Sequence, residues 1–207
     1  MSHPRTGQVA GLLLAAGAGR RMGQPKALLR DAAGVPFVDR AVGLLLEGCD
    51  TVTVVLGASA DEARTLLDEA GWTDDPAVDV VVAEDWAEGM GASLRTGLTA
   101  LQDGPGDAAL VTLVDLPDVD DAVLRRVLDT SSGPGALVRA TYDGRPGHPV
   151  LLGRDHWAGV VATAEGDRGA RTYLAAHEPV ACECGDLATG RDVDRPEDLE
   201  QREAPEA

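Results

Sequence analysis

The chain has 207 residues, of which 44% are hydrophobic and 26% charged, a composition typical of a globular protein. Its formal net charge of −17 opposes binding to nucleic acid or to an anionic membrane surface, because both are polyanionic. No apolar stretch follows a basic start or reaches membrane length, so we expect one cytoplasmic domain over residues 1–207. Any anionic ligand must then be held by a local cluster of basic residues.

Four apolar runs alternate with helical patterns in the first two thirds of the chain. The runs are rich in Val, Leu and Ala, which is typical of strands buried on both faces of a parallel sheet, and they cover residues 9–15, 51–56, 78–83 and 108–114. Helical patterns begin at Pro36 and cover 59–70, 90–101 and 120–128. Ser59 is placed to cap its helix, with Glu62 as capping-box partner. This order predicts an α/β fold with three layers, α/β/α, around a mostly parallel central sheet.

The last third of the chain has a looser pattern. It predicts a strand, a turn, a second strand, a loop leading into a helix, and a short final helix, over residues 136–141, 143–148, 149–152, 163–177 and 196–201. Cys182 and Cys184 have no His or Cys partner at metal-ligand spacing. We therefore interpret them as small residues in a strand.

A glycine-rich basic loop directly follows the first predicted strand. Its glycines and cations are Gly17, Gly19, Gly23, Arg20, Arg21 and Lys26. Glycines let the backbone turn tightly and expose N–H groups, and each cation can make charge-assisted bonds to a phosphate. In a strongly acidic chain this concentration of donors favours a phosphate-binding site over an ordinary glycine-rich surface turn.

Two common nucleotide-binding motifs do not fit this loop. A dinucleotide-binding loop has the pattern G-x-G-x-x-G, but Met22 occupies the third glycine position. A Walker-type loop has Lys directly after its last glycine, whereas two residues separate Gly23 from Lys26. The loop belongs to neither class.

The loop does resemble the opening loop of the molybdopterin nucleotidyltransferase family, through the pattern L-A-A-G-x-G-x-R-M-G-x-x-K. The resemblance implies a nucleotide-diphospho-sugar-transferase-like Rossmannoid fold. It also implies that the triphosphate is bound by Leu14, Ala15, Ala16, Gly17, Gly19, Arg20 and Lys26, with Arg20 and Lys26 acting in catalysis. In the molybdenum-cofactor cytidylyltransferase branch the second alanine goes with CTP, so Ala16 implies cytidine.

An aspartate, Asp115, stands at the end of the fourth predicted strand, where open α/β sheets bind ligands. Its oxygens suit Mg²⁺, and the resemblance assigns Asp115 to the metal and to catalysis. Residues 192–198 resemble the D-x-D-x-P-E-D segment of the family, which supplies a second carboxylate. Because side chains alternate in extended chain, Asp192 and Asp194 share a face and either can be the ligand; we favour Asp194.

Residues 89–98 resemble the G-M-x-x-S-L-x-x-G-L helix of the family. The resemblance implies that Gly91 and Ser93 contact the nucleotide. This chain departs from the pattern at Gly91 and Ala92, where relatives often have serines. Leu94 and Leu98 are expected to lie in the core.

Two further segments, 144–149 and 166–171, resemble those that border the second substrate in relatives. They imply that His148, Arg168 and Arg171 bind that substrate. The two arginines are suited to an anionic group such as a molybdopterin phosphate.

The function implied is transfer of CMP from CTP to a phosphorylated acceptor, molybdopterin or the molybdenum cofactor, with Mg²⁺ and release of pyrophosphate. The implied partners are a nucleoside triphosphate, a small anionic acceptor, and a molybdenum hydroxylase or its chaperone. The alternatives are another acceptor such as a sugar phosphate or phospholactate, a non-catalytic nucleotide-binding or chaperone module, and an NAD(P)H-dependent oxidoreductase. The last arises because the chain also resembles nicotine blue oxidoreductases, although the missing dinucleotide loop weighs against it.

Overall fold

The computed structural model of the chain describes residues 7–195 and 197–198. A seven-stranded sheet crosses the molecule. Its order is β3-β2-β1-β4-β6-β5-β7. The strands are β1 (Val9–Leu14), β2 (Thr51–Leu56), β3 (Val78–Val82), β4 (Ala108–Leu113), β5 (Leu137–Tyr142), β6 (Arg145–Gly153) and β7 (Val180–Glu183). The pairings of β6 with β4 and β5 are antiparallel, and the other pairings are parallel. The predicted mostly parallel sheet is confirmed.

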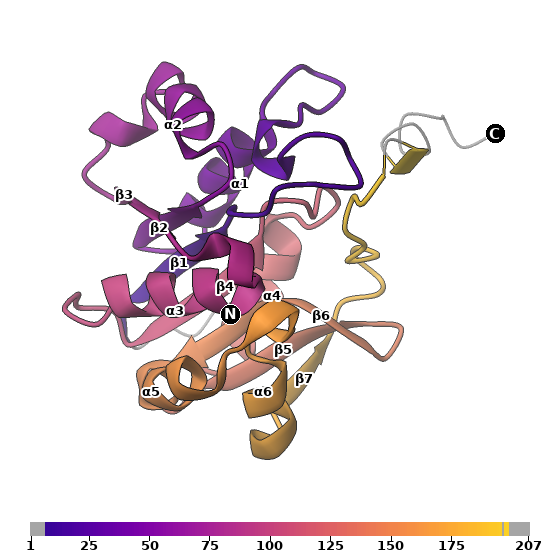
Figure 1. Cartoon of the computed structure of the whole chain (residues 1–207). Coiled ribbons are helices and arrows are strands. Elements are labelled where there is room, and N and C mark those ends of the chain that lie inside the picture. The colour runs from indigo at the N-terminus through magenta and orange to yellow at the C-terminus, as the bar shows by residue number, and fades with distance from the viewer. Residues whose placement is uncertain (1–6, 196, 199–207) are drawn as a thin grey trace.

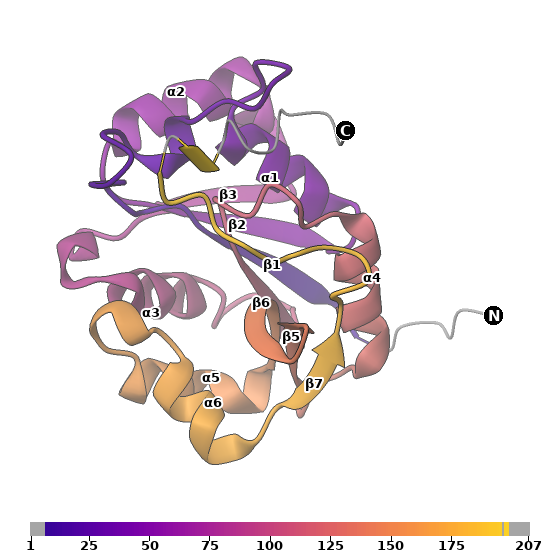
Figure 2. The ribbon, with the colours of Figure 1, turned by 90° about the vertical axis from the view of Figure 1, so that its right-hand side faces the viewer.

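Helices cover both faces of the sheet (Figures 1 and 2). One layer holds α1 (Phe37–Leu46), α2 (Ala60–Glu69) and α4 (Asp121–Thr130), and the other holds α3 (Met90–Ala100), α5 (Arg154–Thr163) and α6 (Arg171–His177). Each layer packs on the sheet through its own cluster of buried side chains. The three-layer α/β/α architecture is therefore confirmed.

The central strand β1 shows why this arrangement forms. All its residues are buried, and successive side chains point to opposite faces, so Leu13 joins one helical layer and Leu12 the other. On the second face α3 lies close to the sheet because Gly97 has no side chain. A Cβ at Gly97 would lie 2.5 Å from Leu12 Cδ1 and 2.9 Å from Val55 Cγ2.

Two local predictions are corrected by the structure. Ser59 does precede α2, but it has a left-handed backbone (φ 55°) and its side chain makes no capping hydrogen bond, so the capping box is absent. The predicted turn over 143–148 is shorter, because β6 already begins at Arg145. Asp143 and Gly144 alone turn the chain, both with positive φ, as a tight hairpin requires. His148 therefore lies on a strand.

Helix α5 was not predicted. It buries only Trp157 and Val160 among its ten residues, so its apolar stripe is too short to stand out in the sequence. The loop leading into a helix that was predicted over 163–177 is confirmed by α6. The predicted loop begins at the last residue of α5 and contains a 3₁₀ turn at Gly166–Arg168 (η4). Among the residues that the structure describes, no helix is long and apolar enough to cross a membrane.

The chain after β7 returns across the carboxyl ends of the central strands. Val193 is fully buried and its N–H donates to the Asp115 carbonyl at 3.0 Å, which fixes the segment beside β4. Cys182 lies on β7 and Cys184 directly after it, and both are buried, as expected of small residues at a strand. Of the predicted final helix, Glu197 and Asp198 are helical, while Pro196 and residues 199–201 lie outside the described residues.

Candidate functional site

The glycine-rich loop and Asp115 meet at the carboxyl ends of two adjacent parallel strands. β1 lies between β2 and β4, so the chain leaves it in one direction toward β2 and β3 and later returns to its other side as β4. Such a reversal opens a crevice at the carboxyl edge, where open α/β sheets bind ligands.

The loop presents its backbone to this crevice. Gly19 has φ +57°, and a Cβ there would collide with the Gln24 carbonyl, so only glycine fits this turn. The Met22 N–H closes the turn by donating to the Gly19 carbonyl at 2.9 Å. The N–H groups of residues 17–21 donate to no other residue within the described ranges. They form a set of donors suited to phosphate oxygens.

Lys26 begins a short 3₁₀ helix (η1, Lys26–Leu28), and its ammonium lies between two carboxylates. Nζ is 2.5 Å from Asp115 Oδ2 and 2.6 Å from Asp194 Oδ1, and Arg21 Nη1 is 3.2 Å from Asp194 Oδ2. Burial opposes the charge of Lys26, but attraction to Asp115 and hydrogen bonds to both aspartates raise its pKa. The hydrogen bond from Lys26 lowers the pKa of Asp194. Burial raises the pKa of Asp115, and the charge of Lys26 opposes that rise.

Three aspartates gather around this position. One carboxylate oxygen each from Asp115, Asp192 and Asp194 lies within 4.8 Å of the others. Asp192 and Asp194 come from an extended segment in which Val193 points into the core, so the alternation expected from the sequence does bring both to one face. A set of carboxylate oxygens fits a hard divalent cation, and the Lys26 ammonium shows that the set already attracts positive charge.

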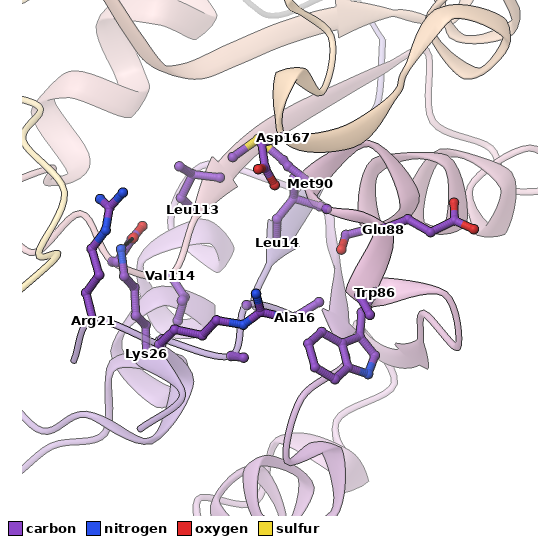
Figure 3. A pocket seen from close by; sticks show the side chains of 18 residues that line it. Leu14, Ala16, Arg21, Lys26, Trp86, Glu88, Met90, Leu113, Val114 and Asp167 are labelled. Atoms are coloured by element: carbon purple, nitrogen blue, oxygen red, sulfur yellow. Dashed lines mark hydrogen bonds and ion pairs between the residues drawn. The ribbon is translucent and has the colours of Figure 1, made fainter. Parts of the chain in front are cut away.

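A cavity of about 530 Å³ opens in front of the loop (Figure 3). Eight of the predicted site residues line it: Leu14, Ala16, Gly17, Gly19, Arg20, Lys26, Ser93 and Asp115. Ala15 and Gly91 do not. Ala15 is buried with its N–H bonded to the Val55 carbonyl at 2.9 Å. Gly91 packs against the backbone before η4, where a Cβ would lie 2.8 Å from the Glu165 nitrogen.

The sequence did not indicate several residues of this first cavity, among them Trp86, Glu88, Met90 and Asp167. In Figure 3 Lys26 lies on one side of the cavity and Trp86 on the other. Trp86 follows β3 in a chain with only 3% aromatic residues, and this position near a strand's carboxyl end was a usable signal. Asp167 lies in the segment 166–171, which the resemblance placed at the second substrate. Tertiary packing brings η4 to the start of α3, so that Asp167 lines the first cavity.

A second cavity of about 240 Å³ adjoins the first, and Leu14, Met90 and Leu113 line both. The structure brings together there the predicted second-substrate residues His148, Arg168 and Arg171, with Arg139 and Asp192 beside them. Asp192 belongs to the aspartate group, so this group lies at the border of the two cavities.

His148 in the second cavity is held neutral by its surroundings. Burial, followed by the positive charges of Arg139 and Arg171, lowers its pKa to about 4. The Tyr142 hydroxyl donates to the His148 carbonyl at 2.6 Å and fixes that stretch of β6. At neutral pH the imidazole adds no charge to the cavity and offers one donor and one acceptor.

An α/β sheet with a basic glycine-rich loop and an aspartate group at its switch point defines a nucleotide-binding enzyme of the nucleotidyltransferase type. The comparisons agree, since residues 11–180 match the family described as "MobA-like NTP transferase domain". The chain belongs to this metal-dependent family.

Individual relatives carry different names. The chain is 36% identical over 203 residues to "Nicotine blue oxidoreductase" of Paenarthrobacter nicotinovorans, covering 92% of this chain and 94% of that one. It is 28% identical over 157 residues to "Molybdenum cofactor guanylyltransferase" of Rhodobacter capsulatus, covering 72% and 66%. Among solved structures it is similar to Rv0371c of Mycobacterium tuberculosis in complex with manganese, with TM-score 0.69, 26% identity, and coverage of 94% and 97%.

Proposed function

We propose that this chain transfers CMP from CTP to the phosphate of a molybdopterin-type acceptor, with Mg²⁺ as the cation, and releases pyrophosphate. The observation that carries the proposal is the position of the aspartates: Asp115 lines the first cavity and Asp192 the second. Asp115 and Asp194 are the proposed ligands, with Asp192 beside them. A cation held there supplies electrophilic polarisation of phosphate oxygens where the two substrates meet.

The proposed reaction is a displacement at the α-phosphorus of CTP. An oxygen of the acceptor phosphate forms the new P–O bond while the bond to the bridging oxygen of the β-phosphate breaks, and pyrophosphate leaves with that electron pair. The acceptor phosphate is already ionised at neutral pH, so no general base is required. The protein contributes alignment and stabilisation of charge.

The chain's own groups divide this work. The N–H groups of residues 17–21, which donate to no other described residue, bind triphosphate oxygens, and Arg20 and Lys26 balance the charge of those oxygens. Lys26 is free to turn toward the triphosphate once a cation neutralises its aspartates. Ser93 lines the nucleotide cavity, whereas Gly91 stays a prediction, because its role in the fold is close packing.

The cytosine assignment rests on Ala16, which lines the first cavity. Ala16 and Trp86 both crowd Gly57, where an added Cβ would lie 2.7 Å and 2.6 Å from their respective Cβ atoms. The Ala16 methyl group takes up room in this cavity, which is consistent with the smaller pyrimidine base. The relatives named guanylyltransferases favour GTP instead, so nucleotide choice is the first property to measure.

A thermal-shift panel tests the proposal, using CTP, GTP, ATP and NADPH, each with and without Mg²⁺. A ligand that binds only the folded state raises the melting temperature, and we expect the largest rise with CTP and Mg²⁺. Pyrophosphate release with molybdopterin, a sugar phosphate or phospholactate then identifies the acceptor. If nucleotides bind but no acceptor leads to release of pyrophosphate, the result would instead indicate a non-catalytic nucleotide-binding module.

The second candidate, an NAD(P)H-dependent oxidoreductase, is carried by the 36% identity to the relative named nicotine blue oxidoreductase. We expect no oxidation of NADPH when the protein is mixed with an oxidised dye. Nicotinamide oxidation, without pyrophosphate release from any triphosphate, overturns the transferase proposal. The remaining parts of the proposal are one domain over residues 1–207, a cytoplasmic location, and delivery of product to a molybdenum hydroxylase or its chaperone.

A further inference from the structure

Arg139 is a cation of the second cavity that the sequence did not single out. It lies on β5, where its backbone pairs with Val150 of β6, and its side chain is partly buried. Nε donates to the Gly147 carbonyl at 3.2 Å, which occupies one of its donors. Within the described ranges its guanidinium forms no ion pair with a carboxylate.

The surroundings of Arg139 are positive in an otherwise acidic protein. Arg139, Arg168 and Arg171 line one small cavity, and Asp192 is its single carboxylate among the described residues. Burial and then the charge of Arg171 lower the pKa of Arg139. An unpaired, partly buried guanidinium costs free energy of folding, and such a group in a cavity is a candidate for ligand binding.

We propose that Arg139 is the anchoring residue for the acceptor, binding a phosphate monoester in the second cavity with Arg168 and Arg171 closing over it. This inference rests on the proposed function and assigns it a residue. Arg168 and Arg171 are exposed and lie on η4 and α6, whereas Arg139 is fixed on the sheet. Arg139 therefore sets the position of the anion.

A phosphate monoester fits the cavity better than a carboxylate. Its three peripheral oxygens can accept from several guanidinium groups at once, and its two negative charges match the excess of arginines over Asp192. His148 is neutral at pH 7 and adds a hydrogen bond without charge. Since Asp192 also belongs to the aspartate group, an anion on Arg139 lies next to the proposed site of transfer.

The test is calorimetric titration with inorganic phosphate, on protein saturated with Mg²⁺ and a non-hydrolysable CTP analogue that fills the first cavity. We expect saturable binding by the wild type. Binding should weaken at least ~10-fold in Arg139→Met, because a hydrogen bond to a charged group is lost, and should partly recover in Arg139→Lys. Arg125→Met, on the exposed side of α4, is the matched control and should bind like the wild type.

A second measurement separates ligand binding from a structural role. Without any anion, the melting temperature of Arg139→Met should equal or exceed that of the wild type, because an unpaired charge has been removed. Unchanged phosphate affinity in Arg139→Met overturns the inference, as does a lower melting temperature with no recovery of binding in Arg139→Lys. If the wild type binds the CTP analogue but not phosphate, the acceptor anchor fails while the transferase proposal survives. If phosphate binds through Arg139 but the melting temperature does not respond to CTP, the role of Arg139 as an anion anchor is supported and the transferase proposal is contradicted.

Discussion

The two cavities are built in different ways although they share a wall. The first takes its cations Arg20, Arg21 and Lys26 from one continuous loop after β1, and Asp115 follows β4. The second takes its polar groups from β5, β6, η4, α6 and the returning C-terminal segment. The cations of the first cavity are thus close together in the sequence, whereas the charged groups of the second cavity come together only through the whole fold.

Their charges differ as well. In the first cavity Lys26 and Arg21 are already paired with the aspartates Asp115 and Asp194. In the second cavity Arg139 has no carboxylate partner among the described residues. The first site thus carries its own counter-charges in the apoprotein, whereas the three arginines of the second cavity outnumber Asp192, its single carboxylate among the described residues.

The substitution Asp115→Asn is the strongest test of the first site, because it keeps the shape of the side chain and removes its charge. We expect turnover to fall about 1,000-fold or more, in the range seen when groups that stabilise transition-state charge are removed. Pyrophosphate release measures the effect, and circular dichroism checks the fold. Asp186→Asn, at an exposed position that pairs with Arg126, is the control and should keep its rate. Turnover within a few-fold of the wild type in Asp115→Asn would remove this residue from the mechanism.

Lys26→Ala tests whether the loop cation serves the triphosphate or only holds the aspartates. Loss of one charge-assisted contact should reduce kcat/KM for CTP about 100-fold. Because Lys26 balances two carboxylates, we also expect the variant to bind Mg²⁺ more readily in the absence of nucleotide. If CTP affinity and rate both stay unchanged, the loop assignment is wrong.

His148 gives the second cavity a dependence on pH. The unfolded chain takes up a proton near pH 6.5, but the folded protein does so only near pH 4, so the free energy of unfolding falls as the pH falls between these values. The loss should reach about 2 kcal/mol, after allowance for partial exposure. Urea unfolding at pH 7 and pH 4.5 measures it. Over the same pH range the free energy of unfolding of His148→Gln should fall by that much less than that of the wild type. Equal falls in the two proteins would contradict the assignment of this pH dependence to His148.

The smallest expected effect concerns the choice between the nucleotide bases cytosine and guanine. Ala16→Gly removes a methyl group that lines the first cavity. It should shift the ratio of kcat/KM for CTP over GTP about 10-fold toward GTP. Steady-state pyrophosphate release with each nucleotide measures the ratio. Ala18→Gly, in the same loop and lining the same cavity, is the matched control. A ratio that responds equally to both substitutions means that loop flexibility, and not the Ala16 methyl group, governs the choice.

Most of the sheet was predictable because buried parallel strands are continuous apolar runs, as in β1 and β2. Helix α5 was missed because only Trp157 and Val160 mark its buried side. The early start of β6 was hidden because Arg145 to His148 contain glycine and proline, which usually indicate a turn. Weak periodicity thus limited the prediction in the last third of the chain.

The sequence by itself determined the glycine-rich basic loop, since glycines and cations that are close along the chain stay close in space. It also placed Asp115 at a strand end and Asp192 and Asp194 on one face. The family resemblance implied that Asp115 and Asp194 bind one cation. Only the tertiary structure decided that Asp192 lies with them, and that Arg139 of β5 joins the arginines near α6. The physical reason is that long-range proximity depends on strand order and helix packing, which no local spacing of residues encodes.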